Sequence, residues 1–477
     1  MSWRDLGAAS PELVLTVAAL AVLLYDAWTT GPSLESPRGG GAGWLALAGV
    51  ALAVLLNAFP PAAPVAFAGM YVRDRLTQAV TLAALLGTGI TVLLSPAYLN
   101  RFRLPAGEYY ALVLFSAVGA ILMGAARNLA VLFLGLEILS FPLYTLAALA
   151  TRSRRSQEAG LKYLLLGAFG TAFFVYGVAL VYGAAGTLDL SRLAGVPITP
   201  LLGVGVALLT IGLGFEAALA PFHAWAPDVY EGAPLPATAF MSVIAKVGAF
   251  AGFLRVFPLA LPAASAQWSA ALVAVAIVTM IWGNLAALFQ TNLKRLLAYS
   301  SIAHAGYMLI GIAAPGPAGT LGVLYYLVVY AVMNLGAFGV LILLERRGEE
   351  ADEIADLAGL WGRAPWAAGV LALCMVSLAG LPPTGGFIAK LYLFRAALEA
   401  RHTALALVAV LTSVVSVYYY LRVAAAALSG TAPDAVAPRR SATVGIALAL
   451  AGAGVLWFGI LPSTLTAFVQ QAVQALR

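Results

Sequence analysis

GLGFEAALAPFHAWAPDVYEGAP, residues 212–234, lies between two apolar runs of the chain, PLLGVGVALLTI before it and ATAFMSVIAKVGAFAGFLRVF after it. The segment holds three prolines and four ionisable side chains: Glu216, His223, Asp228 and Glu231. Proline removes a backbone hydrogen bond from a helix, and protein or water must then satisfy the freed groups. The pattern predicts a membrane helix that is broken around Pro221.

Composition places the whole chain in a membrane. Of its 477 residues, 62% are hydrophobic and only 10% are charged, and the mean hydropathy is +0.95. Soluble domains carry roughly 25% charged residues, so lipid must be the solvent for most of this surface. The apolar runs are long and unbroken, which favours helices over a transmembrane barrel. The sequence therefore predicts an all-α polytopic membrane protein.

About fourteen runs approach the ~20 residues that a helix needs to cross the hydrocarbon core. They lie near residues 11–28, 43–59, 76–95, 108–126, 127–148, 159–183, 199–220, 236–256, 268–290, 295–314, 320–344, 365–398, 402–428 and 441–461. The run at 365–398 is too long for one straight helix, and LPPTGG interrupts it at Pro382 and Pro383. The first run has no clear cleavage site before it, so we expect it to be retained.

Basic residues divide unequally between the two sets of loops. Loops after odd-numbered spans contain thirteen: Arg38, Arg101, Arg103, Arg152, Arg154, Arg155, Lys294, Arg295, Arg346, Arg347, Arg363, Arg439 and Arg440. Loops after even-numbered spans contain six: Arg73, Arg75, Arg127, Arg192, Arg255 and Arg401. Because positive residues collect on the cytoplasmic side, we expect the odd loops in the cytoplasm and both termini outside.

The few cysteines and histidines exclude several kinds of site. Cys374 is the single cysteine, so the chain cannot build a disulfide or a cysteine-ligated cluster. His223, His304 and His402 are scattered, and no strand precedes a glycine-rich phosphate loop. The net charge of +6 suits a membrane protein with cytoplasmic arginines better than a nucleic-acid binder. We expect no metal, no cofactor in this chain and no nucleic-acid partner.

Lysine is rare in this chain and occupies unusual places. Four of the 26 basic residues are lysines, Lys162, Lys246, Lys294 and Lys390, and each falls within or at the edge of a span. A GC-rich genome explains the many arginines but not these positions. A buried lysine can release its proton because desolvation disfavours its charge, whereas arginine keeps its proton in proteins. A lysine in a membrane helix is therefore a candidate proton carrier.

Three ionisable residues are predicted near the midplane of the membrane. Lys246 follows Pro236, which opens its helix, by ten residues, or roughly 15 Å. Glu137 follows Arg127 by the same number, and Lys390 follows the LPPTGGF break. Charged residues at this depth cost at least ~2.5 kcal/mol each and usually mark an ion path. The alternative is a structural buried ion pair.

Other polar residues leave more than one interpretation open. Lys162 and Lys294 begin their spans and either extend to the membrane surface or serve the path. His304 lies about ten residues into its helix, and we favour a relay role over a simple hydrogen-bonded histidine. Structural roles are predicted for the rest: a helix cap for Asp74, a solvated helix end for His402, and packing or an interface belt for Tyr418–Tyr420.

Four stretches resemble the antiporter-like membrane subunits of respiratory complex I, the proton-pumping NADH:quinone oxidoreductase: PFHAWAPDVYEGAP, QTNLKRLLAYSSIAHAGYML, EAGLKYLLLGAFGTAFFVYG and LAGLPPTGGFIAKLYLF. The resemblance covers nearly the whole chain. The motif PDVYEGAP looks like that of the N-type subunit. The chain also ends soon after the fourteenth span, without the long lateral helix of the L-type subunit. Mrp-type cation/proton antiporter subunits share the fold but read differently after PFHxWLPDA.

This resemblance implies one integral membrane domain, residues 1–477, of fourteen helices with two five-helix inverted repeats in which helices 7 and 12 are broken. The breaks around Pro221 and Pro382, about 160 residues apart, agree with such repeats. The chain then divides into helices 1–3 at 1–107, a first repeat at 108–257, a second at 267–428 and a last helix at 441–477.

The resemblance also implies that protons move through buried Glu, Lys and His residues at the midplane. By position it assigns the path to Glu137, Lys246 and Lys390, with Lys162, Lys294 and His304 in supporting places. Glu216 and His223 lie at the first break. From this position we predict that Glu216 is part of the path and that His223 is a supporting residue. Flavin, iron–sulfur clusters and quinone would be held in or near partner subunits of the complex. The membrane-arm neighbours of this chain would be the M-, K-, J- and A-type subunits, in a bacterial inner membrane.

One residue departs from the family pattern. Where the family reads GFK, this sequence reads GFE, so Glu216 replaces the lysine that pairs with the fifth-helix glutamate, here Glu137. Two nearby carboxylates cannot both ionise cheaply, so we expect them to share a proton. Alternatively, Lys246 becomes the counter-ion of one of them.

Three functions follow from these patterns. We favour a proton-translocating, non-redox subunit of a complex I-type NADH:quinone oxidoreductase. A subunit of a stand-alone Mrp-type cation/proton antiporter is the alternative. A purely structural scaffold is disfavoured, because apolar residues would serve a scaffold at lower cost than buried charges.

Overall fold

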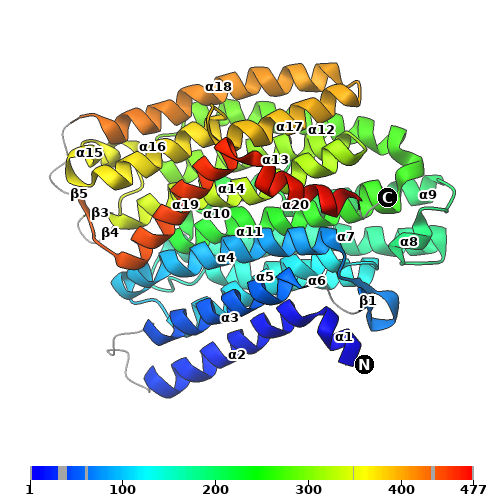
Figure 1. The fold of residues 1–477 in the computed structure, drawn as a ribbon, viewed down its shortest axis with the longest axis horizontal. Helices are drawn as coiled ribbons and strands as arrows, with labels where there is room; N and C mark the ends of the chain where they lie inside the picture. Colours follow the sequence, from blue (N-terminus) through cyan, green and yellow to red (C-terminus); the bar gives the residue numbers. More distant parts are fainter. Residues whose placement is uncertain (1–2, 31–39, 60–62, 347–348, 431–435, 475–477) are drawn as a thin grey trace.

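The computed structural model describes residues 3–30, 40–59, 63–346, 349–430 and 436–474, and most of them are helical (Figure 1). Arg38 and Arg347 of the topology prediction lie outside the described residues. Within this part, twelve helices are long and apolar enough to cross a membrane. They are α2 (Ser10–Thr30), α3 (Gly40–Ala58), α4 (Arg75–Phe102), α5 (Ala106–Ala125), α6 (Leu129–Ala147), α7 (Arg154–Ala185), α11 (Leu235–Leu254), α12 (Ser265–Leu288), α13 (Leu293–Ala313), α14 (Pro317–Leu343), α18 (Thr403–Leu428) and α19 (Ala442–Ile460).

Two further crossings are built from broken helices at the prolines that the sequence marks. The first joins α9 (Pro200–Glu216) to α10 (Trp225–Gly232), and the second joins α16 (Pro365–Ala379) to α17 (Gly385–Glu399). Ala218 in the first break has a φ of 59°, and Gly380 in the second has a φ of 82°. These left-handed residues turn the chain out of the helix, so backbone groups at membrane depth are left without helical partners.

Short elements lie at the ends of the long helices. One group consists of α1 (Trp3–Ala8), β1 (Val65–Ala66), η1 (Phe67–Gly69), β2 (Tyr71–Val72), α8 (Leu190–Leu193), η2 (Arg255–Ala260), η3 (Pro262–Ala264) and the helix α20 (Pro462–Gln474). The other consists of β3 (Leu344–Arg346), β4 (Glu349–Glu350), η4 (Ile354–Leu357), α15 (Leu360–Arg363) and β5 (Val436–Pro438). Strands β1 and β2 pair antiparallel, and the second sheet has the order β4-β3-β5.

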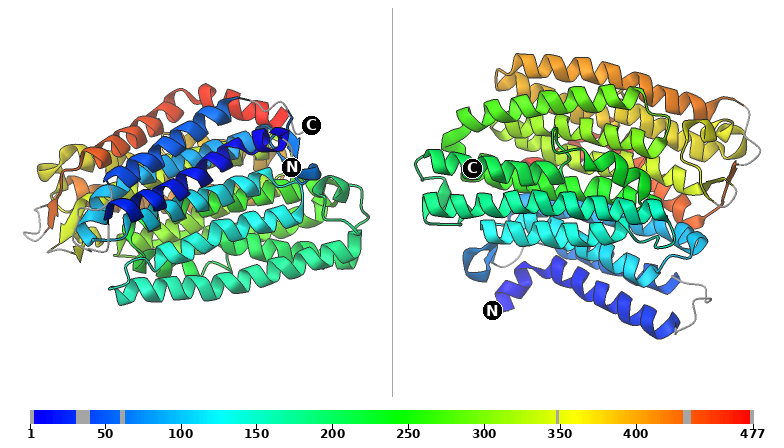
Figure 2. Two further views of the ribbon diagram at one scale, coloured as in Figure 1. Left: turned by 90° about the horizontal axis from the view of Figure 1, so that it is seen from below. Right: turned by 180° about the vertical axis from the view of Figure 1, so that it is seen from behind.

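The long helices run side by side between two ends of the molecule (Figures 1 and 2). We call the end that holds α1, β1, β2 and η2 the termini end, and the end that holds β3, β4 and β5 the sheet end. The markers for both ends of the chain lie toward the termini end in Figure 1. Loops after odd-numbered crossings lie at the sheet end, so those of the thirteen basic residues that fall in the described part of the chain belong to that side.

Helices α11, α13 and α14 form the centre of the bundle. Every residue of α11 is buried, and α13 and α14 are buried over nearly their whole length. Outer helices such as α7 and α18 instead expose large apolar side chains, including Leu165 and Val414. Such exposed apolar surface suits lipid or a membrane partner. Charges on the central helices are therefore shielded from lipid by the surrounding helices.

Candidate proton path

The first buried acid of the path is Glu216, the last residue of α9, which is 2% exposed. Ser140 of α6 donates a hydrogen bond from Oγ to Glu216 Oε2 at 3.0 Å. Glu216 Oε1 is buried without a hydrogen-bond partner among the described residues. Because buried polar atoms are normally hydrogen-bonded, this oxygen is suited to hold a proton or a water molecule.

Glu137 lies in the middle of α6 and is half-buried. Thr171 of α7 donates a hydrogen bond from Oγ1 to Glu137 Oε1 at 2.7 Å. Within the described part of the chain, no hydrogen bond joins the two carboxylates directly. Ser140, which binds Glu216, lies one turn beyond Glu137 on the same helix, and the charge of Glu137 acts on Glu216. The two acids interact, and a shared proton stays a prediction.

Lys246 lies at the centre of the bundle, 1% exposed, in the middle of α11. Its Nζ faces the ring of Tyr330 on α14, 5.9 Å from the ring centroid. The charges of Lys246 and Glu216 also act on each other. Lys246 therefore lies between Glu216, at the first broken helix, and the ring of Tyr330 on α14.

His304 of α13 is buried and hydrogen-bonded through both ring nitrogens. Nδ1 lies 2.6 Å from Tyr326 Oη, and Nε2 lies 2.9 Å from Tyr420 Oη. Its ring centroid is 5.2 Å from that of Tyr330 and 5.9 Å from that of Tyr307. A neutral imidazole donates through one nitrogen and accepts through the other, so this arrangement can take a proton on one side and release one on the other.

Two members of the tyrosine triplet Tyr418–Tyr420 are packed in the core, as predicted, and they also hydrogen-bond to polar side chains. Tyr420 binds His304 and Ser300, and Tyr419 donates to Asn284 Oδ1 at 3.0 Å. Nothing in the sequence around these tyrosines marks them, because their partners lie more than a hundred residues away. Tyr418 is 63% exposed and has the surface position that was expected.

Lys390 of α17 closes the series at the second broken helix. Its Nζ donates to the carbonyl of Ala379, the last residue of α16, and to Ser413 Oγ of α18, both at 2.8 Å. The same Nζ lies 4.9 Å from the ring centroid of Tyr307. The lysine thus satisfies a carbonyl that the break leaves without a helical partner.

These contacts place five ionisable residues in one buried series across the bundle. The order is Glu137, Glu216, Lys246, His304 and Lys390. The ring of Tyr330 lies beside both Lys246 and His304, and the ring of Tyr307 lies beside both His304 and Lys390. Each residue comes from a different helix, so no local sequence pattern brings them together.

Two supporting residues lie away from this series. Lys162 is the ninth residue of α7, not its first, and forms ion pairs with Glu158 at 2.7 Å and Asp228 at 2.9 Å while 41% of its side chain is exposed. His223 does not follow Glu216 on a continuous helix, because α9 ends at Glu216. Its ring instead packs against that of Trp282, with centroids 5.6 Å apart.

Lys294 is covered by protein at the sheet end. It is 1% exposed, and its Nζ donates to the carbonyl of Ala233 at 2.6 Å and to Glu350 Oε2 at 2.8 Å. Sequence reasoning missed Glu350, which lies in an acidic loop segment, GEEADEIAD, that looks like an ordinary solvated turn. His402 stands at a helix end as predicted, as the N-cap of α18, but it is half-buried, and its Nε2 lies 3.0 Å from Ser269 Oγ.

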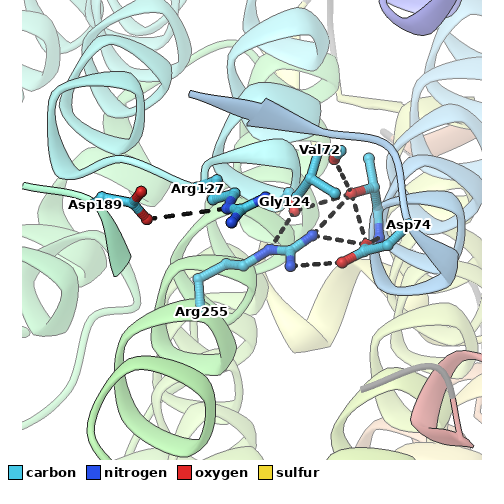
Figure 3. Close-up of polar contacts among 7 residues, drawn as sticks. Val72, Asp74, Gly124, Arg127, Asp189 and Arg255 are labelled. Atoms are coloured by element: carbon cyan, nitrogen blue, oxygen red, sulfur yellow. Dashed lines mark hydrogen bonds and ion pairs between the residues drawn. The ribbon is translucent and has the colours of Figure 1, made fainter. Parts of the chain in front are cut away.

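Asp74 caps α4 as predicted, and it also forms an ion pair that the sequence does not reveal (Figure 3). Its two carboxylate oxygens accept hydrogen bonds from Arg255 Nη1 and Nη2, each at 2.7 Å. Arg255 Nε also donates to the carbonyl of Gly124 at 2.7 Å. Burial alone would raise the pKa of Asp74, but Arg255 and Thr77 outweigh it and hold that pKa below its ordinary value of 3.8. This pair fixes the end of α11 to α4 and α5.

Comparison with known proteins identifies the family. Residues 126–416 match the family model described as NADH:quinone oxidoreductase/Mrp antiporter, TM. A curated relative, NADH-quinone oxidoreductase subunit N of Trichlorobacter lovleyi, is 42% identical over 98% of this chain and 97% of its own length. The chain belongs to the subunit N family of NADH-quinone oxidoreductase. It is therefore a membrane subunit of a complex I-type enzyme, as its sequence motifs predict.

Solved structures agree with this subunit N assignment. A chain of respiratory complex I from Thermus thermophilus with bound aureothin is 37% identical, with a TM-score of 0.82 over 96% of this chain and 98% of that one. A chain of the Mrp complex from Dietzia sp. has the same TM-score, 0.82, at 22% identity. The second likeness concerns the fold alone, which subunit N shares with antiporter subunits.

Proposed function

We propose that this subunit N carries protons across the membrane through Glu137, Glu216, Lys246, His304 and Lys390, driven by quinone reduction elsewhere in the complex. The observation that carries the proposal is the series of these five residues on different helices, of which all but the half-buried Glu137 are buried. Buried charges on separate membrane helices are costly and usually mark ion paths. Redox energy would change their protonation in turn, since each charge acts on its neighbour.

The same proposal places the subunit in a bacterial inner membrane with the sheet end in the cytoplasm. The excess of basic residues in the sheet-end loops supports this orientation. M-, K-, J- and A-type membrane subunits are the expected neighbours, and the exposed apolar faces of α7 and α18 are surfaces that such partners or lipid could cover. Flavin, clusters and quinone would be held in or near partner subunits of the complex.

Replacing Lys246 in the assembled enzyme tests the proposal. Lys246→Met removes the amine, and Lys246→Arg keeps the charge but cannot release a proton at neutral pH. Both variants are expected to lower the number of protons translocated per electron, measured in sealed vesicles alongside quinone reduction. An unchanged ratio in both variants would remove Lys246 from the path.

A stand-alone cation/proton antiporter remains the second candidate, supported by the shared fold of the Mrp complex chain. Such a protein needs no redox partner. The subunit N relatives, which match almost end to end, favour the redox-linked complex.

A further inference from the structure

Helix α11 carries polar side chains on one half only. Thr238, Ser242 and Lys246 follow one another at intervals of four residues, so they share one face of the helix and together span about 12 Å along its axis. From Val247 to Leu254, every side chain is apolar or absent. Since α11 begins at the sheet end, its polar stripe connects Lys246 with the sheet end and not with the termini end.

Helix α13, which packs beside α11, has the same asymmetry. Lys294 and Ser301 lie in its first half, counted from the sheet end, His304 lies at its middle, and residues 308–313 are apolar. The buried hydroxyl of Tyr230 on α10 lies 3.3 Å from Ser301 Oγ. Both central helices thus carry these polar groups between the sheet end and the midplane.

An ion pair closes the other end of α11. Arg255 follows the apolar half directly and is held by both oxygens of Asp74 and by the carbonyl of Gly124 (Figure 3). Arginine does not give up its proton in proteins, and a fixed cation at the end of a path repels protons. The termini end of this helix is therefore a poor route to Lys246.

At the sheet end, Glu350 of β4 lies at the start of the polar stripe. Its Oε2 accepts from Lys294 Nζ at 2.8 Å, and its Oε1 accepts from the backbone N–H of Leu235, the first residue of α11, at 3.2 Å. The hydroxyl of Tyr98 also binds Oε1. The side chain is 20% exposed. Glu350 therefore touches both solvent and the helix that carries Lys246.

Polar side chains line the interval between Glu350 and Lys246. Thr238 Oγ1 donates to the carbonyl of Ala233, the same oxygen that binds Lys294, and Ser242 Oγ donates to the carbonyl of Ala239 at 2.7 Å. Asn334 Nδ2 donates to Ser242 Oγ at 2.5 Å, while Asn334 Oδ1 is buried with no hydrogen-bond partner among the described residues. Buried polar atoms of this kind are normally satisfied by internal water, which would join hydroxyls that lie one helical turn apart.

We propose that Glu350 takes up protons from water at the sheet end and that the stripe of Thr238 and Ser242 delivers them to Lys246. A proton leaves a hydronium ion in solvent and forms an O–H bond on the Glu350 carboxylate. Each hydroxyl or water of the stripe then accepts one proton and donates another. The last transfer forms an N–H bond on the neutral amine of Lys246, and Glu350 returns to a carboxylate paired with Lys294. This inference rests on the proposed function of Lys246.

The test compares three variants of the assembled complex in sealed vesicles. Glu350→Gln keeps the size and the hydrogen-bonding capacity of the side chain but cannot carry a proton at neutral pH. Glu349→Gln, the exposed neighbour on the same strand, is the matched control, and Lys246→Met tests the proposed function itself. Protons translocated per electron and the pH dependence of the pumping rate are measured at equal quinone reduction.

The expected result is that Glu350→Gln lowers the proton-to-electron ratio as far as Lys246→Met does, while Glu349→Gln leaves it unchanged. As the pH rises, the residual pumping rate of Glu350→Gln should begin to fall at a lower pH than the rate of the wild type. A merely structural defect would instead reduce the pumping rate by the same factor at every pH. A wild-type ratio in Glu350→Gln together with a loss in Lys246→Met overturns the inference and spares the proposed function. No loss in Lys246→Met overturns the proposed function and the inference with it.

A second variant covers the case in which Glu350→Gln fails to assemble. Thr238→Val combined with Ser242→Ala removes the two hydroxyls of the stripe and leaves the ion pair at the sheet end untouched. The same loss of proton translocation is expected in this double variant. A wild-type proton-to-electron ratio in it contradicts the proposed route.

Discussion

At the scale of single residues, Glu216 is the least expected member of the path. A buried carboxylate replaces the lysine of the family pattern, and only one of its two oxygens is hydrogen-bonded, to Ser140. Its neighbours provide both signs of charge, since Glu137 and Lys246 act on it from opposite directions along the series. The position therefore suits a group that gains and loses a proton. That group can be a carboxyl, which is neutral when protonated, or an amine, which is then positive.

Two substitutions of Glu216 separate its chemical role from its structural role. Glu216→Gln keeps the shape and the bond to Ser140, so the complex should assemble, but the side chain no longer titrates and proton translocation should fall. Glu216→Lys restores a titratable group and should retain measurable pumping. Protons per electron in vesicles decide the outcome, with the exposed Glu399→Gln as control. Wild-type pumping in Glu216→Gln would make this carboxylate purely structural.

At the scale of elements, the broken helices and α11 hold the path in place. The break after Ala379 frees a carbonyl that Lys390 binds, and the break after α9 leaves Glu216 at a helix end. Helix α11 is fixed at both ends by charge, through Glu350 at its first residue and through the pair of Arg255 and Asp74 beyond its last turn. Lys246 therefore sits on a helix whose position depends on two partly buried carboxylates.

The pair of Asp74 and Arg255 predicts a pH-dependent contribution to stability. Because the folded pKa of Asp74 lies below its ordinary value of 3.8, the pair stabilises the fold at pH values above about 4 and stops doing so as the pH falls through the folded pKa. Asp74→Asn should cost about 3 kcal/mol near neutral pH, since it leaves Arg255 buried without its partner.

The effect of Asp74→Asn is measured by heating the purified complex. Thermal unfolding is monitored through the loss of this subunit from the assembly. The difference between wild type and variant should shrink below pH 4, where the wild-type carboxyl also becomes neutral. Glu108→Gln, an exposed carboxylate in the first turn of α5, is the control and should change little. A difference that is constant with pH would mean that the charge of Asp74 contributes nothing.

At the scale of the whole molecule, the exposed apolar surfaces and the membership of the subunit N family predict that this subunit works within a larger assembly. Solubilised in mild detergent, it should travel with an NADH- or ferredoxin-oxidising assembly and with other membrane subunits. Mass spectrometry of the purified material checks this. Recovery with antiporter subunits alone, and no redox-active protein, would favour the second candidate function.

Much of the architecture could be predicted from local sequence. A helix must place about 20 apolar residues in the hydrocarbon core, so hydropathy locates the spans, and proline locates the breaks at Pro221 and Pro382. Depth along a helix follows from its rise per residue, which is why Glu137, Lys246 and Lys390 could be placed near the midplane. The family motifs extended these predictions to subunit N.

The contacts between helices required the tertiary structure, because their partners are far apart in the chain. Tyr420 meets His304 across more than a hundred residues, and Glu350 meets Lys294 from a loop that reads as an ordinary solvated turn. The sequence by itself determined which segments are long and apolar enough to cross the membrane, since this follows from the helix and the bilayer. Which charges face one another is set by the packing of one helix against another, and this only the fold decided.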